Sequence, residues 1–405
     1  MRRRAWWLLA CGVLLAAFDA GLAVASAGPP IFPIPGFAAN GLQVGGVSRL
    51  NDGGALIAGS LSDDARSPQW RPVVVRLLLD GSVDLGYGTE GVSTPRIGRD
   101  TRATSLATDP QTGSTWIGVA GSHNQGAIVA LNGEGFRHQR FGRHGILGLG
   151  AANAPVALAR QPGQLLVASG TQPCTGCQLT LIDTSTGAVI TRGALTPQAL
   201  TGSARCTGGA ITSAVFLDSR TAQLVFLGAR HCAAQLVAVA TARRNGHISL
   251  QATTTAPLGA STTTALIAAF GSNICLATSG PTSTTFGPLL ASRQAFTQSR
   301  APGGDLIAVV ALGQGACAAL ITNGRQPGAF VVQASVQQRH ATRDAVPRSV
   351  QPLGMFRCHA HLVVIGARAQ NHGRRGTVVV IPVRRGPKIT TASVTVAKRN
   401  STRCS

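Results

Sequence analysis

Two short patterns have the residue types and spacings of known chemical sites. Gly86-Tyr87-Gly88-Thr89-Glu90-Gly91 has the GxGxxG spacing of a dinucleotide-binding loop. Such a loop holds a pyrophosphate only where its glycines lead into the N-terminus of a helix. Val92-Ser93-Thr94-Pro95 follows and cannot open that helix. Cys174 and Cys177 form a CxxC pair between two predicted strands, away from any helix N-terminus that would lower a thiol pKa. We interpret the glycines as a turn and the cysteines as a structural disulfide.

The segment Cys358-His359-Ala360-His361 brings together residue types that bind metals. On a strand its two histidines would share one face, but no nearby carboxylate completes a ligand set. The acidic residues between 80 and 90 do not have the spacing of an EF-hand loop. The sequence also contains no GxSxG, HExxH or paired-carboxylate signature. We therefore predict no catalytic residue, no cofactor and no metal site.

The first 27 residues have the three parts of a secretory signal. Arg2, Arg3 and Arg4 precede an apolar run from Ala5 to Phe18, and residues 25–27 (Ala-Ser-Ala) supply a small-x-small cleavage pattern. The apolar run is too short to span a bilayer comfortably, although an uncleaved anchor is the alternative interpretation. We expect cleavage after residue 27, no membrane span in the mature chain, and a secreted or cell-envelope location.

A repeated unit organises the remainder of the chain. Gly numbers 50 and charged residues are only 12%, a composition typical of strands and turns. An apolar strand after a Gly-, Pro-, Asn- or Asp-rich turn recurs seven times, at residues 55–59, 116–121, 165–169, 224–228, 274–278, 317–321 and 362–366. With a strand before it and two after it, the unit is a four-stranded antiparallel blade. The prediction is an all-β, seven-bladed β-propeller; a pair of β-sandwiches and an open solenoid are the alternatives.

The propeller is predicted to be one domain, residues 28–400, followed by a tail at 401–405. We expect its repeats to start near residues 43, 103, 155, 211, 262, 305 and 348, with the first strand of each lining the axis. The segment from Ile31 to Val44 is expected to lie beside the last blade and close the ring, since an unclosed ring leaves an open sheet edge.

The first two repeats resemble the delta-60 repeat of secreted bacterial propeller-like proteins. Asp80-Gly81-Ser82-Val83-Asp84 is followed by the glycine-rich turn at 86–92, and a second copy has Asn132-Gly133-Glu134-Gly135 followed by Phe141-Gly142-Arg143-His144-Gly145-Ile146. A third fragment occupies residues 37–42. The resemblance covers residues 36–150 and implies a propeller-like fold with no established catalytic residues.

Eight cysteines remain after the signal, and an even number in an exported chain predicts disulfides. They are Cys174, Cys177, Cys206, Cys232, Cys275, Cys317, Cys358 and Cys404. The start of the first strand and the end of the second lie at the same end of an antiparallel blade. We therefore expect Cys206 to pair with Cys232, and Cys174 with Cys177. Three more fall at first hairpins, at the opposite end, where the tail carrying Cys404 would have to reach: Cys275, Cys317 and Cys358.

Charge gives the one functional indication. The net charge is +22, and residues 345–405 contain 11 basic side chains and no acidic one. We expect acidic envelope polymers as partners, bound by Arg374 and Arg375 between the second and third strands of the last blade and by Arg384 and Arg385 after the third. Nucleic acid would bind without specificity. The predicted function is exported, non-catalytic binding or scaffolding. The alternative is a hydrolase or lyase that acts on an extracellular polymer.

Overall fold

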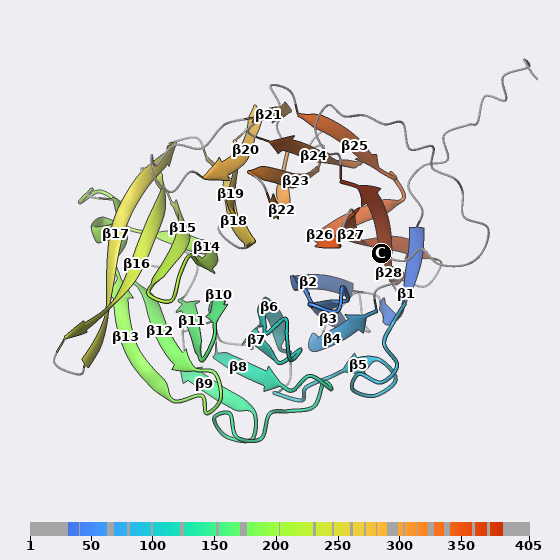
Figure 1. Cartoon of the computed structure of the whole chain (residues 1–405), viewed down its shortest axis with the longest axis horizontal. Helices are drawn as coiled ribbons and strands as arrows, with labels where there is room; N and C mark the ends of the chain where they lie inside the picture. The colour runs from blue at the N-terminus through green and yellow to red at the C-terminus, as the bar shows by residue number, and fades with distance from the viewer. Residues whose placement is uncertain are drawn as a thin grey trace, which may run out of the picture.

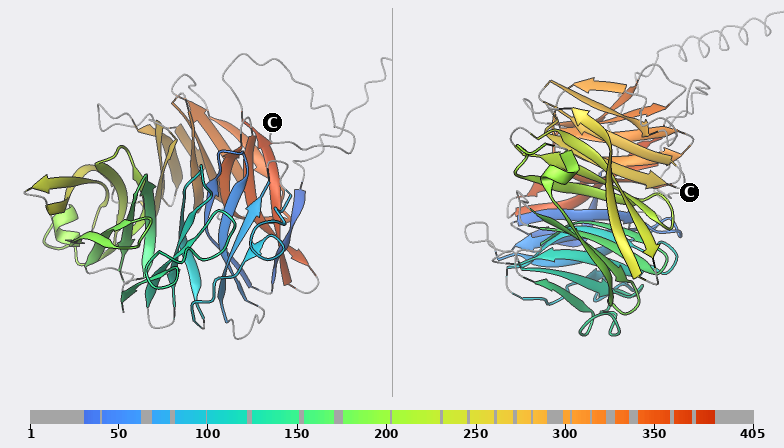
Figure 2. Two further views of the ribbon diagram at one scale, coloured as in Figure 1. Left: turned by 60° about the horizontal axis from the view of Figure 1, so that its bottom comes forward. Right: turned by 90° about the vertical axis from the view of Figure 1, so that its left-hand side faces the viewer.

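The chain folds into a ring of β-sheets around a central channel (Figures 1 and 2). The computed structural model describes residues 31–383 except 40, 63–68, 79–81, 99, 122–124, 151–153, 171–175, 202, 230–231, 245–246, 260–261, 271–272, 281, 290–298, 303, 314, 323–327, 336–340, 359–360 and 371–372. Within these residues, 28 strands form seven four-stranded antiparallel sheets. The prediction of an all-β propeller with four-stranded antiparallel blades is therefore confirmed.

The first four sheets follow the chain order, each with its first strand innermost. The strands of sheet 1 are β2 (Gly41–Arg49), β3 (Ala55–Ser62), β4 (Arg71–Leu77) and β5 (Val92–Ser93). Those of sheet 2 are β6 (Arg102–Thr108), β7 (Thr115–Ala120), β8 (Gly126–Leu131) and β9 (Ile146–Gly150). Those of sheet 3 are β10 (Pro155–Gln161), β11 (Gln164–Ser169), β12 (Cys177–Asp183) and β13 (Val189–Leu195). Those of sheet 4 are β14 (Gly209–Phe216), β15 (Thr221–Gly228), β16 (Ala234–Arg244) and β17 (His247–Gly259).

The remaining three sheets complete the circle. The strands of sheet 5 are β18 (Thr264–Phe270), β19 (Asn273–Ser279), β20 (Ser283–Leu289) and β21 (Ser299–Pro302). Those of sheet 6 are β22 (Leu306–Gly313), β23 (Ala316–Thr322), β24 (Ala329–Ser335) and β25 (Thr342–Val346). Those of sheet 7 are β26 (Val350–Cys358), β27 (His361–Gln370), β28 (Gly373–Pro382) and β1 (Ile31–Ala39). The short helix α2 (Pro197–Thr201) joins sheets 3 and 4, and Thr196 caps its N-terminus.

The ring is closed by the first strand of the described chain. β1 pairs antiparallel with β28, from Ile31 opposite Val379 to Ala39 opposite Arg374. The segment expected beside the last blade therefore lies there as far as Ala39, whereas Gly41 already begins the innermost strand of sheet 1. This pairing covers the edge that β28 would otherwise expose.

The innermost strands bend where they face one another. In sheets 1, 2, 3, 4, 6 and 7 the ladder between the first and second strands shifts register near the start of the first strand, as between Val44 and Gly46 in β2. A β-bulge of this kind increases local bend and twist. Hydroxyls beside the bulges tie neighbouring sheets together: Thr104 donates to the carbonyl of Pro155, and Thr212 to that of Ala265.

The second strands form the core because each is covered on both faces. β3 is buried along its whole length, and its residues divide between two clusters. Ile57 packs with Phe356 and Ile365 of sheet 7, whereas Leu56 packs with Ile117 of sheet 2. Strands covered on both faces have continuous apolar runs, which is why the sequence revealed these strands most clearly.

The glycine-rich turns that follow the third strands fasten sheets 1, 2 and 3 to one another. Tyr87 of sheet 1 is buried beneath Gly135 of sheet 2, and the Gly88 N–H donates to the Glu134 carbonyl at 2.7 Å. The same contact recurs one sheet later, where Phe141 lies against Gly187 and the Gly142 N–H donates to Thr186 at 2.7 Å. We call these two contacts the turn clasps. The GxGxxG spacing thus belongs to a turn, as predicted.

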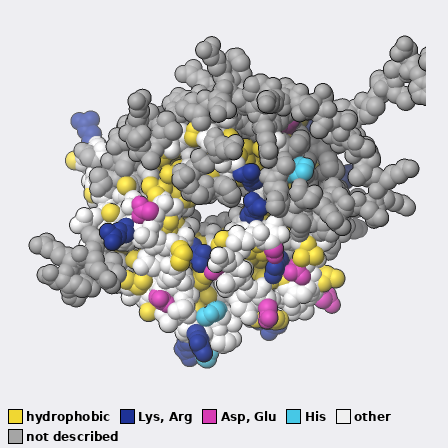
Figure 3. Space-filling model, viewed as in Figure 1, with side chains coloured by type: hydrophobic (Ala, Val, Ile, Leu, Met, Phe, Trp, Pro, Cys, Tyr) yellow, Lys and Arg dark blue, Asp and Glu magenta, His cyan; other side chains and the backbone are white. Residues whose placement is uncertain are grey.

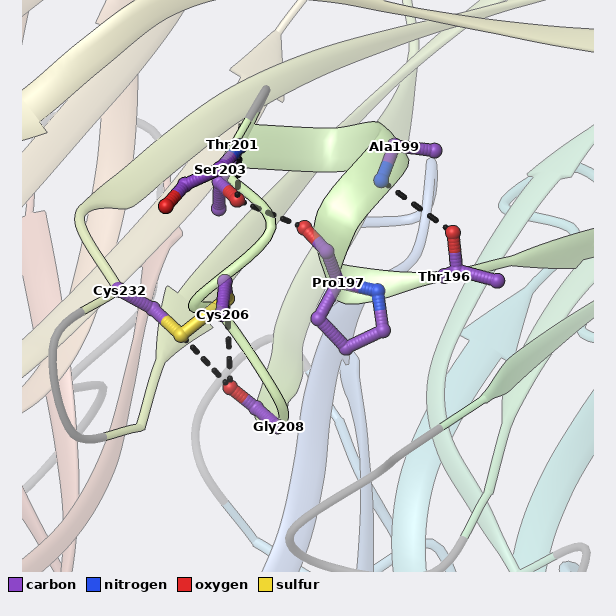
Figure 4. Close-up of a disulfide and its surroundings, with 8 residues drawn as sticks. All are labelled: Thr196, Pro197, Ala199, Thr201, Ser203, Cys206, Gly208 and Cys232. Atoms are coloured by element: carbon purple, nitrogen blue, oxygen red, sulfur yellow. Dashed lines mark hydrogen bonds between the residues drawn. A yellow bond between two sulfur atoms is a disulfide. The ribbon is translucent and has the colours of Figure 1, made fainter.

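Disulfides join the chain in sheets 4, 5 and 6. Cys206 and Cys232 are bonded beside α2 with their Cα atoms 5.0 Å apart, which confirms that prediction (Figure 4). Cys275 of β19 is bonded to Cys317 of β23, Cα to Cα 5.8 Å, so this bond joins sheets 5 and 6. Both cysteines lie beside first hairpins, as the sequence indicated, and their pairing, which the sequence left open, follows because corresponding ends of adjacent second strands lie within bonding distance. Cys177 is also disulfide-bonded. Cys174, Cys404 and the Cys358 side chain lie outside the described residues.

Candidate functional site: the channel mouth

The innermost strands of all seven sheets contribute to one open cavity of about 900 Å³. Its wall runs from the middle of these strands to the first hairpins, so it opens at the end of the channel where those hairpins lie. We call this cavity the channel mouth. Figure 3 shows the central opening, with basic side chains at its edge. The cavity is large enough for a small molecule or a short polymer segment.

Three arginines line the channel mouth: Arg49 of β2, Arg160 of β10 and Arg357 of β26. Each lies at or next to the last residue of an innermost strand, just before the first hairpin. Guanidinium groups are charged at all accessible pH values and carry donors in a planar fork that fits carboxylate and phosphate groups. The three strand ends therefore place three permanently charged groups in the wall of the channel mouth.

Arg160 is held by its neighbours in sheet 2. Its Nη2 lies 2.8 Å from Oδ2 of Asp109, and its guanidinium lies over the Trp116 ring, 5.7 Å from the ring centre. Burial lowers the pKa of Arg160 below its usual value, and the negative charge of Asp109 opposes that shift. Arg160 is thus largely neutralised and serves to join sheets 2 and 3.

Arg49 has a different environment. Its Nε atom is buried and has no hydrogen-bond partner, and within the described part of the chain Arg49 forms no ion pair. Arg357 extends from the adjacent innermost strand and donates from Nη1 to the Leu312 carbonyl of β22, which fixes the direction of its side chain. The Arg357 side chain therefore reaches sheet 6, on the side of β26 away from β2 and Arg49.

Neutral polar groups complete the wall. Thr108 and Gln161 are each 8% exposed, and their Oγ1 and Oε1 atoms have no hydrogen-bond partner in the described protein. The Gln161 amide nitrogen is used, because it donates to Gln164 at 2.6 Å and to the Ser219 carbonyl at 3.1 Å. Buried polar atoms normally have partners, so unpaired oxygens beside a cavity indicate a place where a polar ligand or water can bind.

The acidic residues at the channel mouth are few. Among the described lining residues, Asp218 alone carries a carboxylate, and its Oδ1 accepts the backbone N–H groups of Arg220 and Thr221 at 2.7 and 2.8 Å. Within the described residues, no three His, Cys, Asp or Glu side chains are grouped as a metal site would require. The arrangement is suited to binding an anion by charge and hydrogen bonds.

Two of the basic residues selected from the sequence lie away from the channel mouth, in the third strand of sheet 7. Arg374 and Arg375 were expected in a loop, but they lie within β28, opposite Ala369 and Arg368 of β27. That expectation was wrong because β1 pairs with β28 on its other side, which draws this arginine pair into the sheet. Arg384 and Arg385 lie outside the described residues.

Sequence reasoning missed the channel-mouth arginines. The repeat pattern predicts a Gly-, Pro-, Asn- or Asp-rich turn before each second strand, and Asn51-Asp52-Gly53-Gly54, Asp109-Pro110 and Gln161-Pro162 are three of these turns. Arg49 and Arg160 lie just before two of those turns. Aligning the repeats on these turns would have placed both arginines at equivalent strand ends. The charge run of residues 345–405 directed attention to the outer strands instead.

Comparison with known proteins supports the fold. No protein-family model matches the chain, and no curated protein matches it in sequence. Among solved structures it is similar to the Dos1 propeller, with a TM-score of 0.51 at 10% identity, covering 87% of this chain and 95% of that one. It is also similar to U3-55K, with a TM-score of 0.51 at 11% identity, covering 88% of this chain and 100% of that one. At such low identity these similarities establish a β-propeller and nothing about its ligand.

Two observations bear on location. The disulfides Cys206–Cys232 and Cys275–Cys317 are typical of an oxidising, extracytoplasmic environment. No helix within the described residues is long and apolar enough to cross a membrane.

Proposed function

We propose that this chain is an exported, non-catalytic binding protein whose propeller takes an acidic polymer of the cell envelope or the extracellular space at its channel mouth. The observation that carries the proposal is the channel mouth itself. Its wall holds three arginines, of which Arg160 alone is paired with a carboxylate, that of Asp109, and its single lining carboxylate, Asp218, accepts N–H groups of its own turn. A positive cavity with a low-dielectric wall concentrates anions. The basic residues of 345–405 would extend this attraction across sheet 7.

Two further parts of the proposal rest on the sequence. We propose that residues 1–27 direct export and are removed, in agreement with the oxidising environment that the disulfides indicate. We also propose that sheets 1 and 2 derive from delta-60 repeats. The turn clasps support this relationship, because the aromatic residue and the glycines of the motif form equivalent contacts in successive sheets.

The experiment compares binding of the full mature chain to alginate, a carboxylate polymer, and to neutral dextran. We expect retention on alginate that weakens steeply with added salt, and no retention on dextran, because screening shortens the reach of charge. Equal behaviour on the two matrices would refute the acidic-polymer proposal. Release of new reducing or unsaturated ends from alginate would refute the non-catalytic part and favour the hydrolase or lyase alternative.

A further inference from the structure

The wall of the channel mouth has two sides of different chemistry. At the ends of their innermost strands, sheets 7, 1, 2 and 3 contribute charged or hydrogen-bonding side chains, which are Arg357, Arg49, Thr108, Arg160 and Gln161. We call this part of the wall the polar side. At or near the corresponding strand ends, sheets 4, 5 and 6 contribute apolar side chains, among them Phe216, Ala269 and Val310, and we call this part the apolar side.

The order of the sheets around the ring places the two sides opposite one another. Each innermost strand contacts the next, from β2 through β6, β10, β14, β18 and β22 to β26 and back to β2. Each side is therefore one continuous stretch of the wall of a single cavity (Figure 1). Hydrogen bonds fix both junctions, because Gln161 donates to the Ser219 carbonyl of sheet 4 and Arg357 donates to the Leu312 carbonyl of sheet 6.

The apolar side is only partly covered by the protein. Phe216 and Val310 are partly exposed, and Ala269 is exposed, although all three line the cavity. The one charged residue that this side contributes to the described lining is Asp218, whose Oδ1 accepts two N–H groups of its own turn. Covering apolar surface removes it from water, so this side favours an apolar group of a ligand.

On the polar side, Arg49 is the arginine best placed to bind an acid group. Asp109 already pairs with Arg160, and the Leu312 carbonyl accepts a hydrogen bond from Arg357. The Arg49 Nε is buried without a hydrogen-bond partner, and Arg49 forms no ion pair within the described residues. A buried donor of this kind costs free energy until an acceptor enters the cavity, and a carboxylate fits the guanidinium fork.

The geometry points to an amphipathic ligand: we propose that the channel mouth binds a carboxylate attached to an apolar chain, with the carboxylate at Arg49 and the chain against the apolar side. This inference deepens the proposed function and rests on it for the acidic group. The part of the polymer that enters the cavity carries an acyl-type substituent beside its acid group.

The test measures binding of acetate, hexanoate and decanoate to the full mature chain by titration calorimetry. We expect the affinity to rise by up to about fourfold for each added methylene, because each methylene is removed from water against the apolar side. Decyltrimethylammonium has a chain of the same length and the opposite charge. It should bind about tenfold more weakly than decanoate or worse, since it cannot accept a hydrogen bond from Arg49.

Two variants and two matched controls locate the binding. R49Q removes the charge of the polar side, and A269N places an amide on the apolar side. R140Q and A194N change exposed residues of the same types outside the cavity, in the loop between β8 and β9 and in β13.

The two variants should affect the three acids differently. We expect R49Q to weaken both acetate and decanoate, decanoate about tenfold or more. We expect A269N to weaken decanoate about threefold or more and to leave acetate unchanged, since acetate has no chain to bury. Each control should change binding by less than about twofold. Far-ultraviolet circular dichroism checks that each variant is folded; if R49Q does not fold, R49K, which keeps the charge without the fork, takes its place.

The outcomes distinguish the two proposals. Decanoate binding that R49Q and R140Q weaken equally, or that does not rise with chain length, overturns the amphipathic site, and retention on alginate then leaves the proposed function standing. Decanoate binding that depends on Arg49 and Ala269, without retention on alginate, overturns the acidic-polymer function and keeps the amphipathic site. Absence of both effects in the parent chain overturns both proposals.

Discussion

Sheets 1–3 and sheets 4–6 join their neighbours by different means. In the first group, glycine-rich turns bury an aromatic ring between successive sheets, as Tyr87 and Phe141 show. In the second group no such clasp is found within the described residues. Cys275–Cys317 joins sheets 5 and 6, and Cys206–Cys232 closes a loop within the sheet 4 repeat. The two groups occupy separate arcs of one ring (Figure 1).

The difference follows from what each turn can bury. The clasp requires a glycine with a positive φ on the neighbouring sheet, as at Gly135 (φ 85°) and Gly187 (φ 74°). A Cβ at either position would clash with the backbone of the turn that it contacts. Where the chain no longer repeats that turn, the outer ends of the sheets lack this contact. A disulfide stabilises the folded state there by restricting the conformations of the unfolded chain. The turn clasps thus join sheets 1–3, whereas a disulfide joins sheets 5 and 6.

Phe141→Ala should give the largest loss of stability. Phe141 is fully buried in the second turn clasp, and truncating such a ring costs about 3–5 kcal/mol in free energy of unfolding. Phe136→Ala, in the same loop but 53% exposed, is the matched control and should cost less than about 1 kcal/mol. Denaturant unfolding measures both free energies of unfolding. Similar losses for the two variants would show that burial of Phe141 in the clasp adds no stability beyond that of an exposed ring.

Removing the disulfides should have the next largest effects, in the order of the loops they close. In the chain-entropy model, Cys275–Cys317 with a separation of 42 residues contributes about 4 kcal/mol, and Cys206–Cys232 with 26 residues about 3.5 kcal/mol. Paired Cys→Ala variants, unfolded without reductant, measure each contribution. Losses below about 1 kcal/mol would mean that packing alone holds sheets 4–6.

Tyr87→Phe should leave stability unchanged or raise it by up to about 1 kcal/mol. The Tyr87 hydroxyl is buried without a hydrogen-bond partner, and such a group costs free energy. Burial raises the pKa of Tyr87 above its usual value, with the charge of Arg76 opposing, so the hydroxyl stays protonated and the effect should not vary between pH 5 and 9. A loss of stability on this substitution would show that the hydroxyl has a partner.

Asp183→Asn should have the smallest effect, below about 1 kcal/mol at pH 7. The Ser185 hydroxyl, at 2.6 Å, and the Thr186 N–H and hydroxyl lower the pKa of Asp183, while burial opposes them. A depressed folded pKa gives stability that is present above about pH 3.9 and lost as the pH falls through the folded value. The difference between the parent chain and the variant should therefore shrink on acidification. A difference that grows as the pH falls would contradict this assignment.

The sequence was sufficient to predict features that depend on contacts within a single sheet. The apolar second strands, the turns between strands and the Cys206–Cys232 pair all depend on contacts within a repeat. Contacts between repeats were harder to predict, because they depend on how adjacent sheets face one another. The Cys275–Cys317 bond, the Arg160–Asp109 ion pair and the hydrogen bond from Arg357 to the Leu312 carbonyl are all of this kind.

Hydrogen exchange of the native chain, with and without reductant, tests most directly whether the two arcs are held by different forces. Amide protection reports the free energy of local opening, strand by strand. We expect reductant to lower protection in β14–β25 and in β12, which begins at the disulfide-bonded Cys177, and to leave β2–β9 unchanged, because the turn clasps contain no disulfide. Loss of protection spread evenly around the ring, or confined to sheets 1 and 2, would contradict the account.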